Sequence, residues 1–284
     1  MEFPRTICVD VGASYFAHTS WWFFLGVSRT TWLAIDPNAE NLNYAESWPW
    51  RAQLKLETSC LSEFGGLSTF YKTNVDSGSS LLRPVIDTSS TLHHRHGKID
   101  YFHPVQEIQI ETKRISDVLA ELNPGPIIIK LDTQGSELSI IRDLLQSPLS
   151  HLLIGIEVEC SLLANPTYEN SPRLWEVAHS LEESGFELLN LDVFPSRQPS
   201  TKYRARSRNI SSECDAIFAR RRDVIASPNI ELREVLLGFY LTNAFYHEAL
   251  TLIVDDSEVQ SDLASKGIDV SNLQKVLKRR CKTN

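Results

Sequence analysis

The chain has 284 residues and a formal net charge of −8. A chain of this length can bury one good-sized core, its negative charge argues against general affinity for nucleic acid or anionic membranes, and none of its apolar runs approaches the ~20 residues of a membrane span. Five scattered cysteines without CxxC spacing favour reduced thiols in the cytosol over a disulfide scaffold or a zinc site. The first residues also lack the layout of a signal peptide. We therefore expect a cytoplasmic globular protein that holds no metal and binds no nucleic acid.

Segments with strand and helix patterns alternate along the first 220 residues. Continuous apolar runs such as 127–132 are typical of strands that are covered on both faces in a parallel sheet, and the alternation indicates right-handed crossovers. We predict an α/β fold with a mostly parallel sheet and helices on both faces. The strands are predicted at 6–12, 30–36, 54–58, 68–72, 105–111, 127–132, 152–159, 186–191 and 214–220, and the helices at 17–27, 38–45, 114–122, 137–145 and 171–185, the last with Ser171 as its cap.

Two stretches interrupt this alternation. Residues 73–104 are rich in Ser, Gly, Pro and His with little periodicity, and they are predicted to form a long loop. The tail is helical in pattern, with helices expected at 231–253 and 270–280, the second basic at its C-terminal end as the helix dipole favours. We predict a domain over residues 1–222 and a C-terminal helical extension over 223–284, which packs on the sheet or on a second copy of the chain in a homodimer.

Polar residues gather where the predicted strands end. In open parallel sheets, ligands bind outside the carboxyl ends of the strands, so these residues are expected to share one cleft. Gly12 lies in a turn after the first strand and lets the backbone approach a ligand closely, and the acid Asp36 can accept both hydroxyls of a ribose. The turn lacks the GxGxxG of a dinucleotide site. This disfavours a nicotinamide dehydrogenase and favours a nucleoside without phosphates, such as S-adenosylmethionine.

The segment KLDTQGSE (130–137) joins a buried strand to a helix. Asp132 would be costly to bury without partners, so we expect it to orient the cofactor or the acceptor, or to act as a base. Gly135 allows the helix to begin close to the sheet. Glu137 lies in the first helical turn, where the dipole favours an acid, and it is either a substrate ligand or only a helix-start acid.

Taken in order, these motifs resemble those of the FkbM family of class I S-adenosylmethionine-dependent methyltransferases. The matching pieces are VDVGAS (9–14), IDPN (35–38), CLS (60–62), SGSSLL (77–82), RISDVL (114–119), KLDTQGSE (130–137), IEVE (156–159), ESGF (183–186) and ECDAIFAR (213–220). The resemblance implies a Rossmann-like class I fold and the transfer of a methyl group from S-adenosylmethionine. In this family the acceptor is most often oxygen, on a hydroxyl of a sugar, glycan or natural product.

The resemblance also implies roles for individual residues. Residues expected to bind the cofactor are Asp10, Gly12, Ala13, Ser14, Asp36, Leu61 and Ser62. Residues expected to face the methyl group and the acceptor as catalytic groups are Asp132, Gln134 and Glu157. Residues expected to bind the substrate are Asn74, Ser80 and Glu137.

Two departures from the family pattern keep a second hypothesis open. Gln134 replaces a common acid, and the bulky Tyr15 and Phe16 follow the glycine turn, where they can crowd the pocket. The alternative is therefore a relative without catalysis, which serves as a binding or scaffold module through its C-terminal helices.

Two polar loops allow further interpretations. HHRHGK (93–98) suggests a metal, but no ligand spacing such as HExxH accompanies it, so a solvated or substrate-lid loop is preferred. The basic run 196–209 can close over an acidic acceptor or form a mobile loop of solvated charge, and the second interpretation is preferred.

Overall fold

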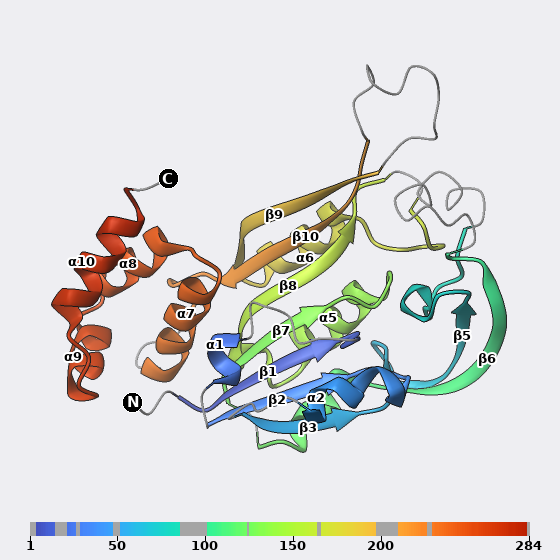
Figure 1. Ribbon diagram of the computed structural model, residues 1–284, viewed down its shortest axis with the longest axis horizontal. Coiled ribbons are helices and arrows are strands. Elements are labelled where there is room, and N and C mark those ends of the chain that lie inside the picture. Colours follow the sequence, from blue (N-terminus) through green and yellow to red (C-terminus); the bar gives the residue numbers. More distant parts are fainter. Residues whose placement is uncertain are drawn as a thin grey trace.

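The chain folds around one central sheet (Figure 1). This computed structural model describes residues 4–14, 22–26, 29–47, 52–85, 101–123, 125–163, 166–196, 210–225 and 229–282. Within that part of the chain, the sheet has seven strands in the order β3-β2-β1-β7-β8-β10-β9. They are β1 (Thr6–Val11), β2 (Thr30–Ile35), β3 (Gln53–Glu57), β7 (Ile127–Leu131), β8 (Leu153–Ser161), β9 (Phe186–Ser196) and β10 (Ile210–Arg220).

The directions of the strands confirm the predicted mostly parallel α/β sheet. The pairs from β3 through β8 are parallel, and β10 runs antiparallel to both β8 and β9. Parallel neighbours need crossover connections, and the helices that make these crossovers bury the sheet from both sides. The carboxyl ends of β1, β2, β7 and β8 therefore meet at one edge.

Helices cover both faces of the sheet, as predicted. Alternate side chains of each strand point to opposite faces, so Ile7 and Val9 enter one apolar core while Cys8 enters the other. The first core is closed by α4 (Ile115–Ala120), α5 (Glu137–Gln146) and α6 (Leu174–Glu183). The second is closed by α1 (Trp22–Leu25), α2 (Asn43–Ser47) and α7 (Ile230–Thr242), with the 3-10 turn η2 (Ala39–Leu42) leading into α2.

A second, three-stranded sheet lies beyond the carboxyl edge, in the order β4-β6-β5 (Figure 1). Its strands are β4 (Cys60–Leu61), β5 (Gly66–Thr73) and β6 (Pro104–Lys113). The strands predicted at 68–72 and 105–111 are present, but their patterns do not predict that they leave the main sheet and pair antiparallel with each other. A 3-10 turn, η3 (Asp76–Gly78), follows β5 inside the segment predicted as a long loop.

The C-terminal tail is helical, but the single helix predicted over 231–253 is wrong. The chain instead forms α7, α8 (Tyr246–Asp255), α9 (Ser257–Ser265) and α10 (Val270–Arg280). The break occurs because Ala244 has φ 61, which ends the helical geometry, and because the Asn243 side chain donates to the Phe239 carbonyl at 3.0 Å. The basic last turn predicted for the final helix is confirmed by Lys278, Arg279 and Arg280.

The tail packs on the main sheet through α7. Phe239 is 1% exposed, and a Cβ placed on Gly155 of β8 would lie 2.5 Å from its ring. The aromatic side chain therefore fits against the sheet because position 155 has no side chain. Burial of such a side chain contributes roughly 1.5–3 kcal/mol. The homodimer through these helices stays a prediction.

The predicted start of the helix at 171–185 is also wrong. Ser171 is not its cap, because α6 begins at Leu174 with Arg173 in the extended conformation of an N-cap. The Arg173 backbone N–H donates to Glu176 Oε2 at 2.9 Å. The Glu176 side chain therefore accepts a hydrogen bond from a backbone N–H that the Ser171 side chain was expected to cap. None of the described helices is long and apolar enough to cross a membrane.

Candidate functional site

A cavity of about 610 Å³ opens at the carboxyl edge of the main sheet. Its walls come from the ends of β1, β2, β7 and β8, from the small sheet and from η3. This volume is within the usual range for small-molecule sites, which are commonly found at this edge of open α/β sheets.

The turn after β1 forms one part of the wall. Gly12 has φ +77, and a Cβ placed there would lie 2.0 Å from the Asp132 carbonyl oxygen. The N–H groups of Gly12 and Ala13 donate to the Ile35 carbonyl at 2.9 and 3.1 Å, and the Asp132 N–H donates to the Val11 carbonyl at 3.1 Å. The turn therefore ties together the ends of three strands, at a position where any side chain would collide with backbone.

Asp10 lies beneath this turn, 2% exposed. Its Oδ2 has no hydrogen-bond partner among the described residues, and burial raises its pKa to about 6, against the attraction of Lys130. A buried carboxylate oxygen without a donor is costly. Asp10 is also one of the residues that line the cavity, so its carboxyl group is a candidate acceptor for a cationic or N–H-bearing ligand.

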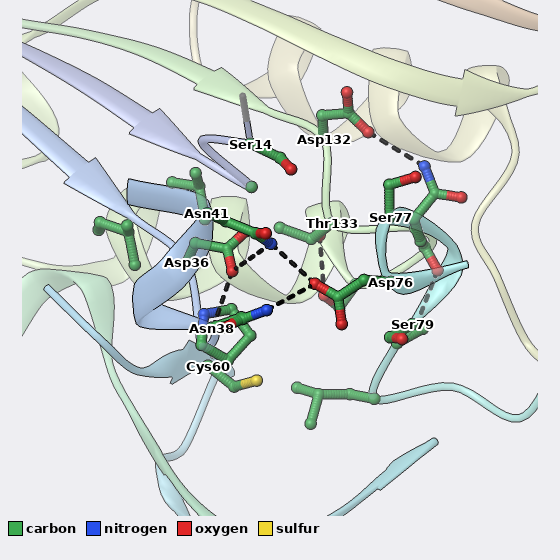
Figure 2. A pocket seen from close by; sticks show the side chains of 18 of the residues that line it. Ser14, Asp36, Asn38, Asn41, Cys60, Asp76, Ser77, Ser79, Asp132 and Thr133 are labelled. Atoms are coloured by element: carbon green, nitrogen blue, oxygen red, sulfur yellow. Dashed lines mark hydrogen bonds between the residues drawn. The ribbon is translucent and has the colours of Figure 1, made fainter. Parts of the chain in front are cut away.

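The carboxyl end of β2 carries what we call the Asp36 wall, formed by Asp36, Asn38, Asn41 and Asp76. Asp36 Oδ1 accepts from the Asn38 backbone N–H at 2.8 Å and from Asn41 Nδ2 at 3.0 Å. Asp76, which belongs to η3, accepts at its Oδ2 from Asn41 Nδ2 at 2.8 Å and from Asn38 Nδ2 at 3.0 Å. Figure 2 shows these four side chains joined on one side of the pocket, with Asp132 on the other. Burial raises the pKa of Asp36 to about 6 even though both asparagines donate to it.

The opposite side is what we call the Asp132 wall, formed by Asp132, Gln134 and Glu159. Gln134 Nε2 donates to Asp132 Oδ1 at 3.1 Å and to Glu159 Oε2 at 2.9 Å. Gln134 adopts φ 60, a left-handed conformation that costs free energy outside glycine. One amide thus bridges two carboxyl groups from neighbouring strands.

Residues from distant segments hold Gln134 in this conformation. Ser80 Oγ donates to the Gln134 carbonyl at 2.8 Å. The Tyr168 hydroxyl lies 2.9 Å from Gln134 Oε1 and 2.8 Å from the Gly78 carbonyl, so it joins the bridge to η3. Tyr168 is 4% exposed and packs edge-on against Phe102. The bridging amide is therefore fixed at both its nitrogen and its oxygen.

The two carboxyl groups of the Asp132 wall have opposite pKa shifts. Burial works against the charge of Asp132, but Lys130, whose Nζ lies 3.2 Å from Asp132 Oδ2, and the hydrogen bonds it receives lower its pKa. Burial and the nearby charge of Asp132 raise the pKa of Glu159 well above its ordinary value. Burial also works against the charge of Lys130, but attraction to Asp132, Asp10 and Glu157 outweighs it, so its pKa is raised.

The structure brings most of the predicted site residues to one cavity. Those that line it are Asp10, Gly12, Ser14, Asp36, Leu61, Ser80, Asp132 and Gln134. Five others are not among its lining residues, namely Ala13, Ser62, Asn74, Glu137 and Glu157. The roles assigned to all of them stay predictions.

Two of these five are acids with identifiable structural partners. Glu137 is 3% exposed, and its Oε1 accepts from the Thr133 and Gly135 backbone N–H groups at 2.8 and 3.0 Å, so it fixes the turn that carries Gln134. Glu157 is buried and lies in register with Lys130, and its charge is one of those that raise the pKa of that lysine.

The other three have more local contacts. Ser62 Oγ hydrogen-bonds Thr112 Oγ1 at 2.8 Å and accepts from the Gly65 N–H at 3.1 Å, so it supports the small sheet. Ala13 is 1% exposed and belongs to the apolar core on the α7 side of the sheet. Asn74 is exposed, and its N–H donates to the His103 carbonyl at 3.1 Å.

Sequence reasoning missed several residues that line the cavity. They are Asn41, Lys72, Asp76, Tyr101, Phe102, Lys130, Glu159, Glu213 and Asp215. For Glu159 a signal was available: it follows Glu157 by two positions on β8 and so faces the same side, closer to the carboxyl end. For Asp76, Tyr101 and Phe102 no local signal existed, because the excursion from the small sheet brings them to the site.

Some predictions lie outside the described residues. Tyr15, Phe16, the segment 93–98 and nearly all of the basic run 196–209 belong to this group. Among the described residues, no group of three or more His, Cys, Asp or Glu side chains is arranged to hold a metal ion.

Comparisons with known proteins agree with the resemblance. The family described as "Methyltransferase FkbM domain" matches residues 10–188, which is more than half of the chain. No curated protein matches significantly. Several solved structures match, among them one described as "Structure of an Antibiotic Related Methyltransferase", with 11% identity over 78% of this chain and 89% of that chain and a TM-score of 0.28. A superposition this weak does not define the fold, which rests on the strand order above. The family match extends from Asp10 in the first strand to β9, and the chain belongs to the FkbM methyltransferase family.

Proposed function

We propose that this protein binds S-adenosylmethionine in the cavity and transfers its methyl group to a hydroxyl of a small-molecule or glycan acceptor. The observation that carries the proposal is that Asp10, Gly12 and Asp36 line one cavity, with Asp10 Oδ2 buried and without a partner among the described residues. A cavity with this orphaned carboxylate oxygen, and with a glycine where a Cβ would collide, fits an amino acid nucleoside.

Each part of the cavity has a chemical match in this cofactor. Asp10 would accept from the ammonium group of the methionine portion, since a charged hydrogen bond to a buried carboxylate is among the strongest available. Asp36 would accept from the ribose hydroxyls, and the backbone at Gly12 leaves room for the chain between them. The apolar side chains of Ile35, Cys60 and Leu61, which line the cavity near Asp36, suit the adenine ring.

The residues on the other side of the cavity would handle the acceptor. When bound, the cofactor supplies an electrophilic methyl group, and much of the rate can come from holding the acceptor hydroxyl in line with it. The Asp132 wall can accept a hydrogen bond from that hydroxyl and so orient it. Tyr101 and Phe102 line the same cavity and offer flat apolar faces, which suit a sugar ring or an aromatic natural product.

Calorimetry with S-adenosylmethionine tests this proposal. We expect binding by the natural chain and a large loss of affinity in Asp36→Ala. The absence of binding, together with no effect of that substitution, would reject the proposal. Quenching by NADH in a fluorescence titration would instead favour a dehydrogenase.

The alternative function is a methyltransferase-fold binding module without catalysis. One observation favours it: the amide of Gln134, at the position where the family often has an acid, is already engaged by Asp132 and Glu159. Cofactor binding without transfer of isotopically labelled methyl to any component of a cell extract would support this alternative.

A further inference from the structure

Glu159 lies at the methyl side of the proposed site, although the sequence resemblance points to Glu157. Both belong to β8 and face the same side of the sheet, but Glu159 lines the cavity. We propose that Glu159 receives the proton that leaves the acceptor during methyl transfer, and that Gln134 positions Glu159 for this step. This inference rests on the proposed function.

The register of the sheet explains why the nearer acid is Glu159. Glu157 pairs with Lys130, does not itself line the cavity, and is one of the charges that raise the pKa of that lysine. Glu159 pairs with Asp215 of β10, which itself lines the cavity. Two residues along a strand therefore separate a buried structural acid from one that a ligand can reach.

Asp132 is less suited to accept a proton. Its Oδ2 lies 3.2 Å from Lys130 Nζ, and its Oδ1 accepts from Gln134 at 3.1 Å. A carboxylate held in its charged form by a lysine has a lowered pKa and is a weak base. Its charge remains available to attract a cation.

Glu159 has the opposite environment. The ionisable groups that act on it come from the turn after β7, α5, β10 and the segment after β8; they are Asp132, Glu137, Glu213, Asp215 and Tyr168. Burial and the neighbouring acids raise its pKa, which brings a carboxyl group toward the range where general bases work at neutral pH. The Gln134 amide at 2.9 Å fixes the direction of its carboxyl group.

The proton and electron balance of this step is simple. The acceptor O–H bond breaks, its proton passes to a carboxylate oxygen of Glu159, and its electron pair forms the new bond to the methyl carbon. The pair that bound this carbon to sulfur stays on sulfur. Glu159 then gives the proton to water when the product leaves.

A base of this kind predicts a measurable change in proton binding without any acceptor. A sulfonium cation placed beside Glu159 favours its ionised form and lowers its pKa, so S-adenosylmethionine should expel a proton that S-adenosylhomocysteine, with a neutral sulfur, leaves in place. Proton release is measured by calorimetry in buffers of different ionisation enthalpy. Over the pH range in which Glu159 titrates, we expect up to about one more proton released by S-adenosylmethionine than by S-adenosylhomocysteine. Any proton released by Asp10 or Asp36 is released on binding of either ligand, so it cancels in the difference between them.

Three variants make this test specific. In Glu159→Gln the difference between the two ligands should vanish, while retained binding of S-adenosylhomocysteine shows that the fold is intact. Glu183→Gln, an exposed acid on α6, is the matched control and should keep the difference. In Gln134→Ala the difference should persist with its midpoint moved to higher pH, because Glu159 loses a donor to its charged form, a shift that a merely structural role would not produce.

Two results would overturn the inference while leaving the proposed function in place. One is equal proton release by the two ligands. The other is a difference that persists in Glu159→Gln, or that is lost only in Glu157→Gln. If neither ligand binds at all, the proposed function fails and the inference fails with it.

Discussion

The two walls of the cavity are built on the same plan. In the Asp36 wall, Asn41 Nδ2 bridges Asp36 and Asp76 at 3.0 and 2.8 Å. In the Asp132 wall, Gln134 Nε2 bridges Asp132 and Glu159 at 3.1 and 2.9 Å. Each wall thus brings two carboxyl groups together on a single amide nitrogen.

The walls differ in what else acts on the carboxyl groups. Asp36 receives a backbone N–H from Asn38, whereas Asp132 lies against the cation of Lys130 and leaves Glu159 to hold a proton more tightly. Carboxyl groups held by amide and backbone N–H donors suit the binding of neutral hydroxyl groups, and an acid pair in which a lysine stabilises the charge of one member suits proton exchange. We therefore infer that the same arrangement of an amide between two carboxyl groups binds the cofactor in the Asp36 wall and accepts a proton in the Asp132 wall.

The largest effect should come from a change that disturbs both walls. Gly12→Ala places a Cβ 2.0 Å from the Asp132 carbonyl at φ +77, so the turn and the end of β7 must move apart. We expect undetectable binding of S-adenosylmethionine and a loss of about 2 kcal/mol or more in the free energy of unfolding. Denaturant titration and calorimetry measure these two quantities.

Gly66→Ala is the matched control for this change. Gly66 also has a positive φ, +91, but nothing lies within 4 Å of its Cβ position. The loss of stability in Gly66→Ala therefore measures backbone strain without a steric collision. Equal losses in both variants would mean that close approach at Gly12 is unimportant.

Removing a carboxylate from the Asp36 wall should have the next largest effect. Asp36→Ala takes away a charged hydrogen-bond acceptor worth about 1.5–3 kcal/mol, which corresponds to a loss of affinity of about 10- to 100-fold. The loss should be the same for S-adenosylmethionine and S-adenosylhomocysteine, because the ribose is common to both. A loss confined to S-adenosylmethionine would mean that Asp36 acts on the sulfonium group and not on the ribose.

Acid pH should weaken binding through the same carboxylates. Burial raises the pKa of both Asp10 and Asp36 to about 6, so protons compete with the ligand below that value. At pH 5 we expect about a tenfold loss of affinity for each carboxylate that must be ionised, with little change above pH 7. Calorimetry across this range measures it, and an affinity that is flat from pH 5 to 7 would contradict the assignment.

The same shifts predict an opposite trend for the free protein. A carboxyl group whose pKa is raised by folding binds protons more tightly in the native state, so its contribution to stability is present below its ordinary pKa and is lost as the pH rises toward 6. Thermal melts of the ligand-free protein should therefore show this contribution falling over the range in which ligand affinity rises.

The smallest effect should come from the bridging amides. Asn41→Ala removes one neutral donor from Asp36 and Asp76 and should reduce affinity for both ligands about fivefold, the equivalent of about 1 kcal/mol. Gln134→Ala should leave the affinity for S-adenosylhomocysteine almost unchanged, since its partners face the acceptor side. Calorimetry with both ligands tests whether the two bridges differ in this way.

Sequence patterns predicted the main sheet and the places of Gly12 and Asp36 at its carboxyl edge, because these depend on local signals. Strand periodicity, the glycine of the first turn and the acid that ends β2 are each readable within a few residues. The position of Glu159 could have been read from the alternation of β8, and it was missed because the motif quoted for the resemblance ended on it without separating it from Glu157.

The remaining site residues and the break in the C-terminal helix could not be predicted from local sequence patterns. Asp76 and Tyr168 reach the site from segments whose patterns show no period, and their placement depends on contacts with Asn41 and Gln134 that lie far away in sequence. The break between α7 and α8 depends on one left-handed residue, Ala244, in a stretch whose helical periodicity is otherwise uninterrupted. Tertiary contacts decide the first case, whereas in the second a local hydrogen bond from the Asn243 side chain to the Phe239 carbonyl competes with the helix.

The space left by the absent side chain of Gly155 has a practical consequence for work with this protein. Phe239 fills it from α7, some 50 residues beyond the end of the family match at residue 188. A fragment trimmed to the matched region would lose α7 together with β10 and most of β9, and the apolar side chains that it exposes along β8 would favour aggregation. Recombinant versions designed for crystallisation or screening should therefore keep β9, β10 and α7.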